Sequence, residues 1–91
     1  MSDRITPEKA EILALEALAW LAADESGIER FLAASGVDGA DLREAAGSPG
    51  LAVAILDFLL GHEALLLAFC QSSGTSPATL HRARHQLQPE A

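Results

Sequence analysis

The sequence predicts an all-α protein, a compact bundle of about six helices that occupies residues 1–91 as one domain, with flexible ends at 1–6 and 88–91. Three observations predict this class. A Ser or Thr directly before a proline occurs three times, and this pair is typical of a helix start. Glycine follows the apolar runs, as it does at helix ends. Tyrosine is absent and no segment alternates apolar with polar residues, so no strand is indicated.

The first expected helix starts at Thr6-Pro7, where the hydroxyl suits an N-cap and the proline suits the first helical position. From residue 12 to residue 23 it is apolar on nearly every side, with Glu16 as the one charge. A helix that is apolar all round is typical of a buried position. We therefore expect it at the centre of the core rather than on a surface, with residues 24–27 ending it.

Two short helices are expected to follow in the first half. Apolar residues at i, i+3 and i+4 from Ile28 indicate an amphipathic helix, and Gly36 is placed for the left-handed conformation that ends one. Asp38 and Asp41 have the spacing of a capping box, with Asp in the usual Glu or Gln place. They predict a helix of one or two turns that ends at Gly47.

The second half predicts three more helices, each bounded by the same kinds of signal. In order, they are an apolar helix over 51–60, opened by Ser48-Pro49 and ended by Gly61; a helix over 63–73, stopped by Gly74; and a last helix opened by Ser76-Pro77, which ends before Pro89.

The two halves resemble each other. Residues 13–46 align with 51–84 without a gap, and 11 of the 34 aligned positions are identical, where this composition gives about three by chance. Similar caps and apolar spacings can also look repetitive in any helical protein, which is the alternative interpretation. Because caps, glycines and apolar positions agree together, we expect two tandem three-helix units related by a pseudo-twofold axis, with the two long helices packed on each other.

Composition excludes several classes of protein. A chain of 91 residues has room for one modest core and is too short for a large enzyme architecture. Its single cysteine, Cys70, excludes an internal disulfide framework and a zinc site built from paired cysteines, and is expected to be a small buried hydrophobe. No apolar run follows a basic start, so we expect no signal peptide and a cytoplasmic location. Residues 51–70 are apolar enough to suggest a membrane span, but Asp57 and the His62-Glu63 pair interrupt them, which favours a helical hairpin in a core.

A DNA-binding helix-turn-helix is the alternative function. The two short helices of the first half have its outline, but Asp38, Asp41 and Glu44 would face the phosphates. The last helix carries the one basic cluster, so Arg82 and Arg84 are the candidate nucleic-acid contacts.

No catalytic, cofactor or metal site is predicted. His81 and His85 stand at i, i+4, a spacing at which two imidazoles can share a metal, but no third ligand is near in sequence. Asp57 lies in an otherwise apolar helix, where a carboxylate is unfavourable unless it is paired. A structural role is expected for it rather than a catalytic one, because no acid–base partner is near it in sequence. It is expected to face solvent, to accept from a helix N-terminus or to pair with Arg30.

Three segments, taken together, resemble a family of small alphaproteobacterial proteins known as a domain of unknown function: 13–22, 30–36 and 56–69. The resemblance extends from about residue 8 to residue 87 and implies no activity. The family pattern has an Asp where His62 stands, which implies that His62 is a variant cap of the following helix. The repeat and the family segments single out the same candidate structural or interaction positions: Trp20, Phe31, Asp57, Phe58, Glu63 and Phe69.

The net charge of −7 is unevenly distributed. Residues 13–46 carry a charge of −5, whereas acids and arginines balance in 51–84. An acidic half repels nucleic acid and can steer a basic partner, although it can also serve only solubility. We therefore expect a non-enzymatic cytoplasmic binding or adaptor protein whose partner is another protein, with no cofactor, no membrane and an oligomeric state that the sequence leaves open.

Overall fold

The computed structural model describes residues 5–36 and 49–87, and these contain five α-helices and no strand. The helices are α1 (Pro7–Ala22), α2 (Glu25–Ser35), α4 (Pro49–Leu60), α5 (Glu63–Ser73) and α6 (Pro77–Gln86). The all-α prediction is confirmed. The helix expected between Asp38 and Gly47 lies outside the described residues, as do residues 1–4 and 88–91 of the expected flexible ends.

Three of the described helices, α1, α2 and α6, begin at a hydroxyl or carboxylate cap. The side chain of Thr6 accepts from the N–H of Lys9 at 3.1 Å, and Ser76 caps α6 in the same way, which confirms both predicted starts. The first helix ends at Ala22, just before residues 24–27, which were expected to end it, but the second helix begins at Glu25 rather than near Ile28. Asp24 accepts from the N–H of Ser26 at 3.1 Å and so caps α2, which begins one residue later.

Two helices end at a glycine in the left-handed region. Gly36 has a φ of 78° and Gly74 a φ of 76°, where a Cβ would be strained. The N–H of each glycine bonds back to a carbonyl four residues earlier, on Leu32 and Cys70 respectively. The predicted ends of α2 and α5 are thereby confirmed.

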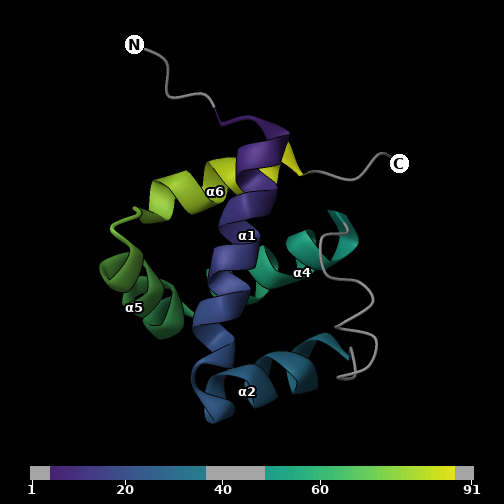
Figure 1. Ribbon diagram of the computed structural model, residues 1–91, viewed down its shortest axis with the longest axis vertical. Coiled ribbons are helices and arrows are strands. Elements are labelled where there is room, and N and C mark those ends of the chain that lie inside the picture. Colours follow the sequence, from purple (N-terminus) through teal and green to yellow (C-terminus); the bar gives the residue numbers. More distant parts are fainter. Residues whose placement is uncertain (1–4, 37–48, 88–91) are drawn as a thin grey trace.

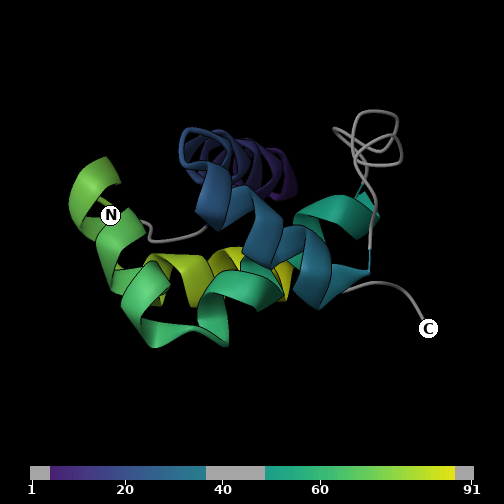
Figure 2. The ribbon, with the colours of Figure 1, turned by 90° about the horizontal axis from the view of Figure 1, so that it is seen from below.

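The chain folds so that α1 lies across α4 and α6, which form the layer beneath it (Figures 1 and 2). The α2 helix crosses the far end of α1 and also packs on α4. At Gly61 and His62 the chain turns sharply, and α5 makes an angle of 107° with α4. Among the described residues, no single helix is long and apolar enough to cross a membrane, and α4 with α5 reaches that length only as this bent pair.

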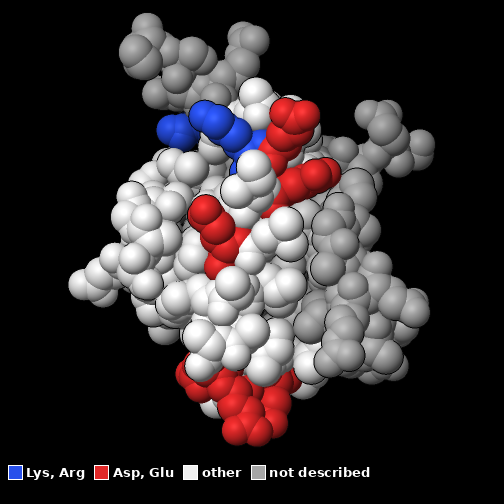
Figure 3. Space-filling view, viewed as in Figure 1, with Lys and Arg blue, Asp and Glu red and all other residues white. Residues whose placement is uncertain are grey.

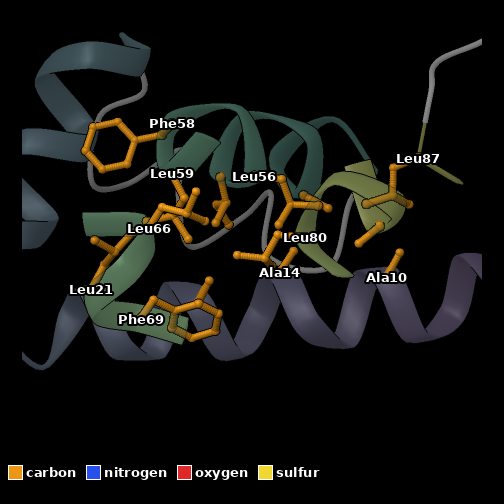
Figure 4. Close-up of a cluster of buried hydrophobic side chains, with 14 of the residues drawn as sticks. Ala10, Ala14, Leu21, Leu56, Phe58, Leu59, Leu66, Phe69, Leu80 and Leu87 are labelled. Atoms are coloured by element: carbon orange, nitrogen blue, oxygen red, sulfur yellow. The ribbon is translucent and has the colours of Figure 1, made fainter. Parts of the chain in front are cut away.

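The core lies between α1 and the α4–α6 layer. Figure 4 shows Ala10 and Ala14 of α1 directed toward the leucines of α4 and α6. Three alanines of α1 are fully buried, and α4 supplies more of the large buried side chains than any other helix. The fully buried large side chains are Leu21, Phe31, Ile55, Leu56, Leu59, Phe69 and Leu80.

The central position expected for residues 12–23 is not what the structure shows. One face of α1 is open, with Ile12 55% and Leu15 40% exposed. The covered side of α1 is the one that carries the buried alanines and Leu21, and it packs on α2, α4 and α6. The most enclosed helix is α4, in which Gly50 and Asp57 are the exposed residues among those whose side chains are described.

The four aromatic side chains form two pairs between the halves of the chain. The rings of Trp20 and Phe69 meet edge-on with centroids 5.6 Å apart, and those of Phe31 and Phe58 do so at 5.4 Å. Each pair joins one helix of the first half to one of the second. Edge-to-face pairs at this distance are favourable beyond the area that they bury.

Candidate functional site

Asp57 is exposed on α4 and forms an ion pair with α6. Its side chain is 54% exposed, and its Oδ1 accepts a hydrogen bond from Nε of Arg84 at 2.6 Å. The carboxylate therefore faces solvent, which is one of the three environments expected from the sequence. Its ion-pair partner is Arg84 and not Arg30. The two residues are 27 apart in sequence, so no local spacing indicated the pair.

His62 occupies the N-cap position of α5, as the family resemblance implies, and its carbonyl accepts from the N–H of Leu66 at 2.9 Å. Its side chain makes no capping hydrogen bond to α5. Instead Nδ1 lies 2.7 Å from the carbonyl oxygen of Phe58, to which it donates because a carbonyl only accepts. The imidazole also lies against the Phe58 ring at a centroid distance of 4.4 Å. The next residue, Glu63, is exposed in the first turn of α5, where its charge suits the helix dipole.

Ser35, Asp57 and His62 line one pocket of about 300 Å³ between α2 and α4. A hydroxyl, an imidazole and a carboxylate are the groups of a hydrolase triad, in which the carboxylate must hold the Nδ1 hydrogen of the imidazole. Here that nitrogen donates to the main chain and the carboxylate accepts from Arg84. The three groups share a pocket but are not connected as a proton relay.

Cys70 is buried on α5, as the sequence predicts. Burial raises the pKa of its thiol by disfavouring the thiolate. Because the thiolate is the nucleophile, the folded chain holds this sulfur in its less reactive form at neutral pH.

The basic residues of α6 differ in their exposure to solvent. Arg82, His81 and His85 are exposed, whereas Arg84 is 23% exposed and paired with Asp57. The two candidate nucleic-acid contacts therefore differ in environment, because Arg82 faces solvent and Arg84 is held by a carboxylate. In the described part of the chain, no three His, Cys, Asp or Glu side chains come together as a set that could hold a metal ion.

A groove runs beside the exposed face of α1, and sequence reasoning did not identify it. It has a volume of about 440 Å³ and lies between the first turns of α1 and the turn that leads into α6. The lining side chains are Ile5, Lys9, Ile12, Leu13, Glu16, Thr75 and Thr79. One signal in the sequence pointed to this face: Ile12 and Leu15 lie on the side of the helix opposite the buried alanines, with i, i+3 spacing.

The surface around this face is acidic. Residues 5–36 contain six acids and only Lys9 and Arg30 as bases, whereas acids and arginines balance in 49–87. None of the six acids forms an ion pair within the residues that the structure describes. Figure 3 shows acidic side chains over the upper part of α1, with basic side chains beside them, and further acids at its junction with α2, with uncharged surface between the two acidic groups. The acids are Glu8, Glu11, Glu16, Asp24, Glu25 and Glu29.

The comparisons with known proteins identify the family. The family model described as "Protein of unknown function (DUF3572)" matches residues 7–90, so the chain belongs to this family. No curated protein and no solved structure matches the chain.

Proposed function

We propose that this member of the DUF3572 family is a non-enzymatic binding or adaptor protein of the cytoplasm, which recruits a basic segment of another protein to the outer side of α1 and α2. The observation that carries the proposal is the exposure of Ile12 and Leu15 near acids that form no ion pair among residues 5–36 and 49–87. Aliphatic side chains that face solvent beside like charges are typical of an interaction surface. The alphaproteobacterial origin implied by the family resemblance is part of the same proposal.

The arrangement of polar groups favours binding over catalysis. A catalytic site requires a nucleophile or base whose partners leave it available to a substrate. Two polar groups of the α2–α4 pocket instead stabilise the fold: the imidazole of His62 donates to the carbonyl of Phe58 at the end of α4, and Asp57 links α4 to α6. Burial also disfavours the thiolate of Cys70, which is the reactive form of the side chain.

We also propose that the chain is duplicated. Two three-helix units, over 13–46 and 51–84, would then be related by a pseudo-twofold axis. Two observations support it. The α2 and α5 helices have the same length, lie 38 residues apart and each end at a left-handed glycine.

The aromatic pairs provide the second observation. The 38-residue shift aligns Trp20 with Phe58 and Phe31 with Phe69. The observed contacts are Trp20 with Phe69 and Phe58 with Phe31. Each pair becomes the other when the halves are exchanged, which is the pattern that a twofold axis generates. The proposed duplication then leaves one copy acidic and the other neutral.

DNA binding through α6 is the second candidate, favoured by the exposure of Arg82 beside two exposed histidines. Non-specific affinity for DNA depends on the number of phosphates that a protein neutralises. Here one arginine is available and the other is already paired with a carboxylate. The acids of residues 5–36 add long-range repulsion.

An electrophoretic mobility-shift experiment separates the two functions. At micromolar protein and about 50 mM salt, we expect no shift of mixed-sequence duplex DNA, because counterion release from so few contacts is small. The double variant Arg82→Ala, Arg84→Ala provides the control and should give the same result as wild type. A salt-sensitive shift that this variant abolishes would overturn the proposed function and indicate a DNA-binding regulator.

A further inference from the structure

The groove beside α1 is lined by both aliphatic and polar side chains. Ile5, Ile12 and Leu13 supply the aliphatic surface, and the polar side chains are Lys9 and Glu16 of α1, Thr75 of the α5–α6 turn and Thr79 of the first turn of α6. Its volume of about 440 Å³ is sufficient for one or two large aliphatic side chains together with part of their backbone. The groove is therefore large enough for side-chain anchors from another polypeptide.

The exposed residues of α1 extend this apolar surface along the helix. Leu15 lies one turn beyond Ile12, about 4.5 Å further along the helix axis. An amphipathic helix presents its own anchors at i, i+3 or i+4 and i+7, which repeat at a similar distance. A helical ligand laid along α1 can thus place one anchor in the groove and a second against Leu15.

The charges beside these apolar residues determine which helix fits. Glu8, Glu11 and Glu16 lie on α1 near the anchors, and only Lys9 opposes them there. A helix with Lys or Arg on the flanks of its apolar face would neutralise these carboxylates. Nucleic acid and anionic lipid surfaces would both be repelled by them.

A second copy of the chain is a poor occupant. Its basic helix α6 has Arg82 and two histidines exposed, but Leu80 and Ala83 are fully buried in its own core, and the exposed apolar side chain of that helix is the small Ala78. The exposed side of α6 therefore has charge but no aliphatic anchor. A foreign segment that carries both properties fits the groove better.

We propose that this groove binds a basic amphipathic helix of a partner protein, with aliphatic anchors placed on Ile12 and Leu15 and with Lys or Arg beside Glu8 and Glu16. The proposal rests on the proposed function and specifies its partner class.

The probe is a fluorescein-labelled peptide of about 15 residues, made of Leu and Lys with Leu at helical spacing. Fluorescence anisotropy with the full chain at about 50 mM salt should give a micromolar dissociation constant that weakens as salt rises. A second peptide keeps every Leu and replaces every Lys with Glu, and it should bind at least about tenfold more weakly. Equal binding of the two peptides, or no binding of the basic one, would overturn the proposal.

Matched variants locate the binding face. Ile12→Ser should weaken the basic peptide about tenfold, whereas Leu67→Ser, at a residue of similar exposure on α5, should leave binding within about twofold of wild type. Glu16→Gln should weaken it severalfold and Glu63→Gln should not. Circular dichroism of each variant confirms the fold. Equal effects within a matched pair would contradict the placement in this groove.

Two further outcomes distinguish a failure of the groove proposal from a failure of the proposed function. Self-association of the free chain that Ile12→Ser abolishes would assign the groove to a second copy and overturn this proposal. Loss of peptide binding without any DNA shift overturns the groove alone, whereas the DNA shift described above overturns the proposed function as well.

Discussion

Replacing Phe58 with alanine should lower the free energy of unfolding by about 3 to 5 kcal/mol. The side chain is 6% exposed and lies between two rings, edge-on to Phe31 and against the imidazole of His62. Truncation removes both contacts and leaves a cavity where α2 meets α4. A domain of this size is stable by only about 5 kcal/mol or a little more, so much of the variant should be unfolded at room temperature.

Urea unfolding followed by circular dichroism measures this effect. Leu67→Ala is the matched control, because that side chain is 49% exposed and should change stability by no more than about 0.5 kcal/mol. A Phe58→Ala chain that unfolds at nearly the same urea concentration as wild type would show that the two aromatic contacts do not stabilise the fold.

Enlarging Ala14 to leucine should destabilise the chain by about 1 to 3 kcal/mol. Ala14 is fully buried and points from α1 toward the layer that α1 crosses (Figure 4). A leucine there would push α1 away from α4 and α6. Helix propensity does not account for the loss, because alanine and leucine are both strong helix formers.

The exposed Ala19 of the same helix provides the control for this variant. Ala19→Leu adds the same atoms on the solvent side and should leave the melting temperature within a few degrees of wild type. Equal melting temperatures for the two variants would show that the small size of Ala14 is not required for α1 to pack on α4 and α6.

Helix bounds were predictable from sequence because the interactions that set them are local. The hydroxyl of Thr6 reaches an amide three residues later, and the N–H of Gly74 reaches a carbonyl four residues earlier. Such contacts depend on residue type and spacing, which the sequence displays directly. Asp24 was misjudged because an aspartate can follow one helix or begin the next, and its cap on α2 decides between them.

The candidate site was less predictable because it depends on packing. A helix that is apolar on every side indicates burial, but which side is covered depends on where other helices lie, so the exposure of Ile12 and Leu15 was missed. The ion pair of Asp57 with Arg84 joins residues that no local pattern relates. His62 was expected to act on the helix that follows it, whereas its ring reaches back to Phe58.

Site-specific photo-crosslinking in the producing cell tests the binding function most directly. A benzophenone amino acid replaces Ile12 in one strain and Leu67, of similar exposure, in another. The proposed function predicts a covalent product with another protein at position 12 and none at position 67, and the product should disappear when Glu8 and Glu16 are changed to Gln. Equal products at both positions, or products that contain DNA instead of protein, would contradict it.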